Sequence, residues 1–192
     1  MVYNQSMSTT TIILIVLALV VLWAIYSYNN LVTLVNQAKE AWADINVQLK
    51  RRYDLIPNLV ETVKGYATHE KSAFENVTKA RAAAMGATGT ESKAQAENML
   101  SSALKSLFAV SEAYPDLKAN QNFLQLQKEL GDTEDKIQAS RRFYNAAVMT
   151  LNTAEQTFPG NIIASTFSFK PMDLFKLAAA DAAANEPVKV SF

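Results

Sequence analysis

Few residues in this chain of 192 could carry out chemistry. The single histidine, His69, stands next to Glu70, a pair that suggests acid–base chemistry. A lone histidine with no second ligand and no neighbouring nucleophile is more often structural. Cysteine is absent, and the five glycines form no phosphate-binding loop. We therefore expect no catalytic residue, no metal site, no cofactor and no enzymatic activity; a hydrolase that uses His69 is the remaining alternative.

Five charged side chains fall on or beside helix faces that should be buried. They are Arg52, Glu70, Arg81, Glu134 and Arg141. A buried charge must be paired, or its desolvation is very costly. We expect ion pairs that fix the register of the helices, which is the best-attested use of such groups. The alternative is a polar cluster that binds a partner or responds to pH.

The overall charge excludes one class of partner. Eighteen basic residues balance eighteen acidic ones, and no long basic run occurs. The chain therefore lacks the electrostatic footprint of a protein that binds nucleic acid. Apolar residues make up 49% of the sequence and charged residues 19%, which indicates a folded chain.

The first element is an apolar stretch, Ile12–Tyr26, which reads IILIVLALVVLWAIY. With its uncharged flanks it gives about 20 residues, enough to cross a bilayer. Trp23 and Tyr28 lie near one end, where an interfacial aromatic belt belongs. A signal peptide or a buried core helix is the alternative, but no basic region precedes the stretch and no small-residue cleavage site follows it. We predict an uncleaved transmembrane anchor that contacts lipid through Ile12–Tyr26.

Basic residues favour one orientation of this anchor. No Lys or Arg precedes the span, whereas Lys39, Lys50, Arg51 and Arg52 follow it. This asymmetry predicts that the soluble domain is cytoplasmic. Because only Lys39 lies close to the span, the periplasmic or extracellular side is the alternative.

Four amphipathic segments with short connections predict an antiparallel four-helix bundle. The longest is Asn120–Phe158, in which large apolar residues recur every seventh position, as in a coiled coil. The other three are Asn30–Tyr53, about Leu55–Met85, and Glu91–Ala113. Since the longest helix exceeds its partners, we expect one end of it to protrude or to meet another chain.

The first turn of the bundle is predicted at Asp54 and Pro57. Asp caps helices, and Pro is tolerated in a first helical turn. The alternative is one long helix with a kink at Pro57. Nothing in the sequence breaks the chain between the anchor and this point, so the anchor and the first amphipathic helix can be continuous.

The C-terminal segment, residues 161–192, differs from the rest. It follows Phe158-Pro159-Gly160, is rich in aromatic residues, and carries a possible short Ala-rich helix at Leu177–Ala184. Exposed aromatic residues are costly in water, so we expect them to pack on the bundle, on another subunit or on lipid. The candidate assembly contacts are Phe167, Phe169 and Phe175.

The expected fold is therefore all-α. An N-terminal tail and transmembrane anchor occupies residues 1–28, a helical bundle occupies residues 29–160, and the aromatic segment follows.

Three longer motifs carry a specific resemblance. Val47–Glu70 reads VQLKRRYDLIPNLVETVKGYATHE, Ala119–Asn152 reads ANQNFLQLQKELGDTEDKIQASRRFYNAAVMTLN, and Phe158–Phe169 reads FPGNIIASTFSF. In sequence, order and spacing they resemble the LemA family of membrane-anchored bacterial proteins. The resemblance implies a single N-terminal span followed by a helical bundle, and it implies no known catalytic activity. A similar magnetosome-membrane protein suggests membrane organisation, by analogy alone.

Two functions follow as expectations. The first is a self-assembling structural or scaffolding protein at the membrane, a homo-oligomer, because small residues line the long helix and catalytic residues are lacking. The alternative is an accessory or sensor subunit that binds a peptide or a membrane-protein partner through the bundle.

Overall fold

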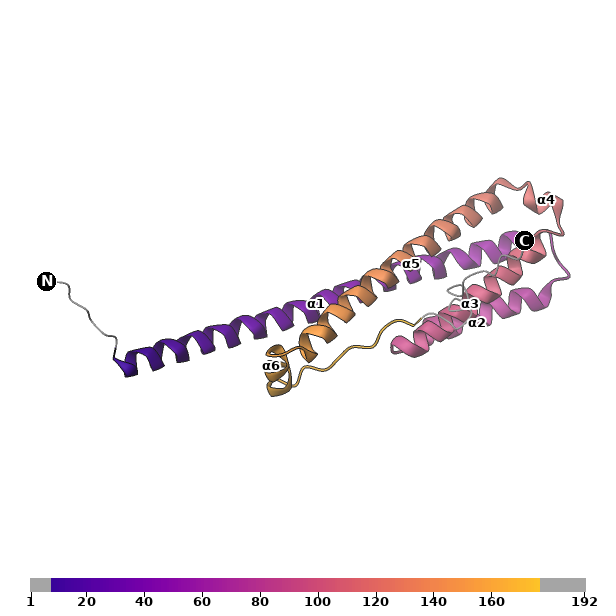
Figure 1. The fold of residues 1–192 in the computed structure, drawn as a ribbon. Helices are drawn as coiled ribbons and strands as arrows, with labels where there is room; N and C mark the ends of the chain where they lie inside the picture. Colours follow the sequence, from indigo (N-terminus) through magenta and orange to yellow (C-terminus); the bar gives the residue numbers. More distant parts are fainter. Residues whose placement is uncertain (1–7, 177–192) are drawn as a thin grey trace, which may run out of the picture. The chain divides into compact units, whose positions relative to one another are not determined.

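The computed structural model describes residues 8–176 and shows six helices in that range (Figure 1). They are α1 (Thr9–Lys64), α2 (Lys71–Gly86), α3 (Thr90–Ser111), α4 (Pro115–Lys118), α5 (Gln121–Gln156) and α6 (Gly160–Thr166). No strand occurs among these residues, and the predicted all-α fold class is confirmed. The helix predicted at Leu177–Ala184 lies outside the described residues.

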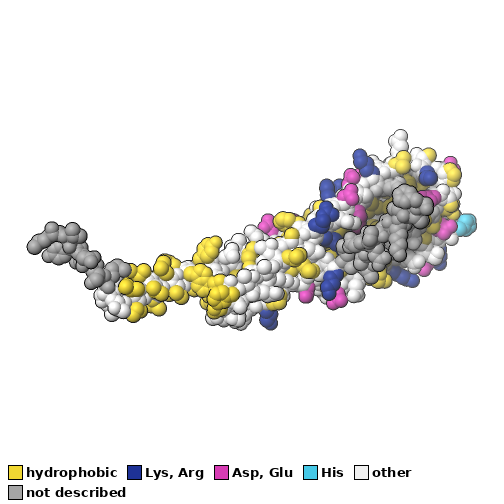
Figure 2. Space-filling view, in the orientation of Figure 1, with side chains coloured by type: hydrophobic (Ala, Val, Ile, Leu, Met, Phe, Trp, Pro, Cys, Tyr) yellow, Lys and Arg dark blue, Asp and Glu magenta, His cyan; other side chains and the backbone are white. Residues whose placement is uncertain are grey.

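Helix α1 joins the predicted anchor and the first amphipathic segment in one helix of 56 residues. Neither glycine nor proline occurs in it before Pro57, so nothing interrupts its hydrogen bonds earlier. Its N-terminal part is long and apolar enough to cross a membrane. The large side chains there are exposed, and Figure 2 shows them as a hydrophobic surface without charged groups.

The turn predicted at Asp54 and Pro57 is wrong, because α1 continues through this proline. Proline has no N–H, and so the carbonyl of Tyr53, four residues earlier, loses its usual helical donor. Arg81 of α2 replaces it: its Nε donates to the Tyr53 carbonyl oxygen at 2.8 Å. The chain turns at Gly65 instead, after the end of α1.

The described chain divides into two compact units. We call the first the anchor unit; it combines the described residues up to Glu40 with Ala146–Met172. The second, the bundle unit, combines Ala41–Asn145 with the residues that follow Met172. These boundaries differ from the division expected from the sequence, because α1 and α5 each contribute to both units.

The bundle unit contains the C-terminal part of α1, then α2, α3 and the N-terminal part of α5. The second helix, predicted over about Leu55–Met85, begins only at Lys71, because residues 55–64 belong to α1. Helices α2 and α3 lie side by side, joined by a short turn at Gly89, whose φ of 80° is in the region that favours glycine (Figure 1). Apolar side chains at helical spacing fill the core. The largest fully buried ones include Ile45, Leu49, Ile56, Leu59, Leu100, Leu107, Phe123 and Tyr144.

The anchor unit has a separate, smaller core. Leu31 of α1 packs with Ile163 and Ala164 of α6, and Trp23, Ala24, Ala154 and Phe169 pack around them. Because Ala154 belongs to α5, the end of this long helix is used inside the anchor unit. The surplus length that the sequence predicts thus has a use within the chain itself.

Gly160 permits the close approach of α6 to α5. A Cβ atom at this position would lie 2.7 Å from the carbonyl oxygen of Ala154, which no real Cβ tolerates. Glycine is therefore required where α6 begins.

The role of Arg81 can be tested against Pro57. The change Arg81→Leu should lower the free energy of unfolding by about 1–3 kcal/mol, because it leaves the Tyr53 carbonyl unsatisfied in a buried setting. In a Pro57→Ala background the same change should cost much less, since the restored backbone N–H serves that carbonyl. Urea unfolding of the full chain in detergent, followed by circular dichroism, measures both costs. Equal costs in the two backgrounds contradict this role, and Arg142→Leu, at an exposed position, is the control.

Candidate functional site

A network of charged and polar side chains surrounds Arg52 in the bundle unit. Arg52 lies on α1 and is 2% exposed. Its Nη2 donates to Oε2 of Glu97 on α3, and its Nη1 donates to Oε2 of Glu134 on α5 at 2.5 Å. The same Nη1 donates to Oγ of Ser101 at 3.1 Å. One guanidinium group therefore joins three helices.

Tyr53 extends this network beyond the guanidinium group. Its hydroxyl donates to the second carboxylate oxygen of Glu97, and Nζ of Lys93 lies 5.3 Å from the centre of its ring. Burial raises the pKa of the Tyr53 hydroxyl well above its usual range, and the hydrogen bond to Glu97 raises it further. The hydroxyl therefore stays protonated at neutral pH and remains a donor.

The five charged residues predicted as a cluster do not form one site. Arg52 and Glu134 pair with each other, as described above. Glu70 accepts a long hydrogen bond of 3.4 Å from the Tyr114 hydroxyl. Arg141 stacks on the ring of Phe175, with Cζ 4.4 Å from its centre. Arg81, as shown above, binds a backbone carbonyl. Only Arg52 and Glu134 form an ion pair with each other, and Glu70, Arg81 and Arg141 contact three other parts of the chain.

Glu97, the main partner of Arg52, is absent from the residues singled out in the sequence. It is 3% exposed. Its position could have been found: it precedes Leu100 by three residues and Leu104 by seven, and both leucines are buried. Residues three and seven apart share one face of a helix, so Glu97 had to lie on the buried face of α3.

A groove opens beside this network. It lies between α3 and α5 and has a volume of about 670 Å³. Its lining is mixed, with apolar side chains next to amide and charged groups. The lining residues are Arg52, Ser101, Leu104, Lys105, Phe108, Gln127, Leu130, Gly131, Glu134 and Gln138. The groove is thus suited to an elongated, partly apolar ligand.

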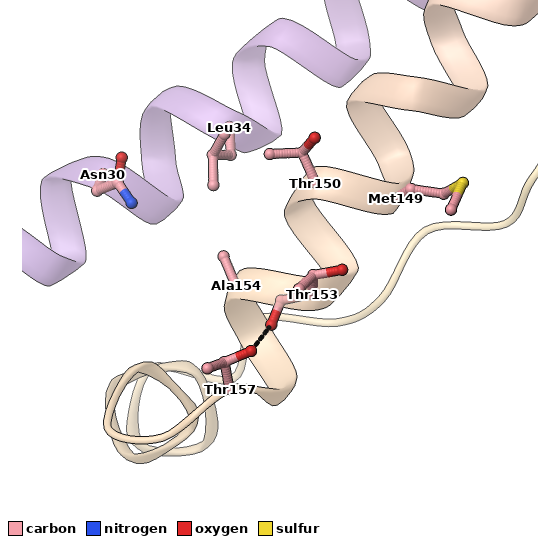
Figure 3. Close-up of a pocket in the computed structure, with 7 residues that line it drawn as sticks. All are labelled: Asn30, Leu34, Met149, Thr150, Thr153, Ala154 and Thr157. Atoms are coloured by element: carbon pink, nitrogen blue, oxygen red, sulfur yellow. Dashed lines mark hydrogen bonds between the residues drawn. The ribbon is translucent and has the colours of Figure 1, made fainter.

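A second hollow, of about 590 Å³, lies in the anchor unit between α1 and α5 (Figure 3). Asn30 and Leu34 line it from α1, and threonines line it from α5. The hydroxyl of Thr150 donates to a helix carbonyl at 3.0 Å, and that of Thr157 does so at 2.7 Å. Because these donors are already used and no charged residue lines the hollow, it offers less for recognition than the groove.

The three candidate assembly residues differ in exposure. Phe167 is 56% exposed. Phe169 is partly covered, with its ring 5.7 Å from that of Tyr28. Phe175 is 1% exposed and lies against Trp42, at 5.8 Å between ring centres. Its buried ring leaves almost no surface for a second chain.

Asn145 explains why Phe175 is held inside. The side-chain amide accepts from the backbone N–H of Phe175 at 2.8 Å and donates to its carbonyl at 3.1 Å. Two bonds from one side chain fix the backbone of an otherwise irregular segment.

His69 and Glu70 show no catalytic arrangement. His69 is exposed in the connection between α1 and α2, and Glu70 is half-buried beside it. Among residues 8–176, no group of three His, Cys, Asp or Glu side chains could hold a metal ion.

The anchor unit holds one buried carboxylate that sequence reasoning did not find. Glu155 of α5 is 7% exposed, and neither of its carboxylate oxygens has a hydrogen-bond partner in the described part of the chain. Burial raises the pKa of Glu155 above its ordinary value. The site therefore favours the neutral acid.

Comparison with known proteins identifies related chains. Residues 41–192 match the sequence model of the LemA family. Protein LemA of Metamycoplasma hominis is 28% identical over an alignment of 156 residues, which covers 81% of this chain and 69% of that protein. Magnetosome protein MamQ of Magnetospirillum gryphiswaldense is 26% identical over 174 residues, with 77% of this chain and 64% of the relative covered. Magnetosome protein MamQ 2 of Paramagnetospirillum magneticum is also 26% identical, with 64% of its length covered.

Two facts about these relatives matter for function. The chain spans just under two thirds of the length of the magnetosome proteins that it matches. None of the names describes an enzymatic activity. Together with the apolar part of α1, they support a membrane anchor.

The Arg52 network predicts a specific pattern of stabilities. The change Arg52→Met should lower the free energy of unfolding by about 3–5 kcal/mol, because Glu97 is left as a buried charge without a cation. Adding Glu97→Leu should recover most of that loss, since the buried carboxylate is then gone. Glu134→Gln should cost far less, because the Glu134 side chain is 37% exposed. Urea unfolding of the wild type and the three variants measures these free energies of unfolding. A double variant as unstable as Arg52→Met alone contradicts the ion-pair role.

The burial of Glu155 predicts that replacing it with glutamine increases the stability of the protein in a pH-dependent way. Because its folded pKa is raised, its protonated form contributes stability below the unfolded pKa, and that contribution is lost as the pH rises through the folded pKa. Glu155→Gln should therefore stabilise the protein near neutral pH and change it little in mild acid. Thermal melts at several pH values check this. Glu112→Gln, at an exposed position, should show no such dependence.

Proposed function

This chain belongs to the LemA family, and on that premise we propose that it is a non-enzymatic scaffold that holds a partner protein at the membrane. The observation that carries the proposal is the groove between α3 and α5, which lies beside the Arg52 network. The apolar N-terminal part of α1 supplies the membrane anchor. Basic residues after the span favour a cytoplasmic bundle, which stays a prediction.

The shape and lining of the groove favour a helical partner. Two helices bound it, and buried Leu104 and Leu130 with half-buried Phe108 form its apolar surface. An amphipathic helix binds such a groove by placing its apolar face against these side chains. Gln127 and Gln138 also line the groove and are exposed, so their amides can bond the polar edges of a bound helix.

Charge adds a second requirement on that partner. The charged residues that line the groove are Arg52, Lys105 and Glu134, so the groove has no excess negative charge and Glu134 is its one carboxylate. The side chain of Glu97 is 4% exposed, whereas that of Glu134 is 37% exposed and lines the groove. A Lys or Arg on the partner helix would pair with Glu134. We therefore expect an amphipathic helix with a basic residue at the edge of its apolar face.

Self-assembly, the role expected first from the sequence, has less support. Of its three candidate contacts, Phe175 is buried within its own chain and Phe169 is partly covered. The end of α5, expected to meet another chain, packs against α6 of the same chain. Phe167 remains as an exposed contact, and a homo-oligomer stays a prediction.

Filling the groove with a large side chain tests whether a partner protein binds there. A photo-cross-linking amino acid at Gln138 of the full-length protein, activated in native membranes, should join it to one defined protein. The change Gly131→Trp should abolish that product, because it fills the groove; no atom lies within 4 Å of a Cβ at this position, so the fold has room for it. Band mass on a denaturing gel and peptide sequencing identify the product.

Two controls make the result specific. Gly86→Trp, also at a position with no atom within 4 Å, should leave the product intact. The same cross-linker at Gln95, an exposed residue of α3 outside the groove, should not form it. A product that survives Gly131→Trp, or one made only of this chain, counts against docking of a partner in the groove.

A further inference from the structure

Helix α6 lies beside the end of the membrane span. Trp23 and Ala24 of the apolar stretch are half-buried, and they pack against the cluster that contains Ile163 and Ala164 of α6. The ring of Tyr28 lies 4.8 Å from that of Phe167, which follows α6 directly. All these residues belong to the anchor unit, so α6 and the end of the span form one packed structure.

The rise of an α-helix gives the depth of this contact. At 1.5 Å per residue, Trp23 and Ala24 lie about 6–8 Å before Tyr28, the last residue of the uncharged flank that follows the apolar stretch. Elements that lie in the membrane interface reach about 5–10 Å into the boundary between headgroups and acyl chains. A helix packed on Trp23 and Ala24 lies at that depth.

Three large exposed apolar side chains lie in α6 or close beside it, next to the exposed polar residues Asn161, Ser165 and Thr166 of the helix. Phe158 is 75% exposed, Ile162 is 50% exposed and Phe167 is 56% exposed. Three large apolar side chains grouped around one short helix are costly to leave in water, and such a group marks an interaction surface.

The same region carries no exposed charge. No charged residue occurs between Gln156 and Phe169. Glu155, just before it, is buried in a site that favours its neutral form. The hydroxyls of Ser165 and Thr166 donate to the carbonyl of Ile162 at 3.0 and 2.7 Å, which lowers their need for water, whereas Asn161 is exposed. Helix α6 therefore suits the interfacial layer, where Asn161 stays hydrated, rather than the acyl-chain core.

From these observations we propose that Phe158, Ile162 and Phe167 insert into the interfacial layer of the bilayer and give the protein a second membrane contact beside its span. Helix α6 packs against the end of the span, and lipid surrounds that end. The bilayer is therefore the partner that these exposed side chains contact. Since the surface has no basic residue, neutral lipid suffices, and added salt does not weaken the contact. This contact is independent of the groove between α3 and α5.

The absence of cysteine makes a direct test straightforward. Ile162→Cys in the full-length protein is labelled with an environment-sensitive fluorophore and reconstituted into phosphatidylcholine vesicles. Quenching is measured with a phospholipid that carries a nitroxide near the headgroup and with iodide in the water. Leu19→Cys, within the span, and Lys136→Cys, an exposed residue of the bundle unit outside the groove, are the references. Phe158→Cys repeats the measurement at an independent exposed position.

The expected result is quenching of the Ile162→Cys and Phe158→Cys labels by the nitroxide lipid, with loss of iodide quenching and no change on adding salt. Labels as open to iodide as that of Lys136→Cys overturn the proposal. Protection from both quenchers also overturns it, because a second copy of the chain then covers α6. Circular dichroism of each labelled protein confirms that the fold is kept, and the groove cross-link reports separately on partner binding.

Discussion

The bundle unit depends on the burial of one guanidinium group. Arg52 joins α1 to Glu97 of α3 and to Glu134 of α5, and its desolvation costs several kcal/mol unless such partners are in place. Its Nε is buried and finds no acceptor in the described part of the chain. An ion network of this kind adds little net stability, but any slip of one helix would separate the charges. We infer that it fixes the register of the helices and thereby sets the shape of the groove beside them.

A second constraint is that backbone groups without a helical partner need a side chain to bond them. Arg81 takes the carbonyl that Pro57 leaves without a helical donor. Asn145 and Asn152 each bond both the N–H and the carbonyl of one residue in the irregular segment after α6. Few buried backbone groups can stay unpaired. The arginine therefore allows a proline inside α1, and the two asparagines allow the irregular segment to pack against α5.

Sequence periodicity predicts most of the helices. It fails where the local structure depends on a side chain that is distant in the sequence. The heptad pattern in α5 and the apolar stretch in α1 are local features of the sequence, and each predicts a helix that the structure contains. The continuation of α1 through Pro57 depends on Arg81, 28 positions away from the carbonyl that it serves. The burial of Phe175 depends on Asn145, 30 positions earlier. Helix phase placed Arg52 and Glu134 on or beside buried faces but did not predict which charges pair, and Glu97 was missed although its phase is equally clear.

These features describe a bundle tied to the membrane by α1 and, as we propose, by α6, with a groove open to a partner. The proposal that a different protein occupies this groove is tested most directly by native mass spectrometry of the full-length protein released from its own membranes. Docking predicts a complex of one chain with another protein. A complex made only of copies of this chain would contradict it and would favour self-assembly instead.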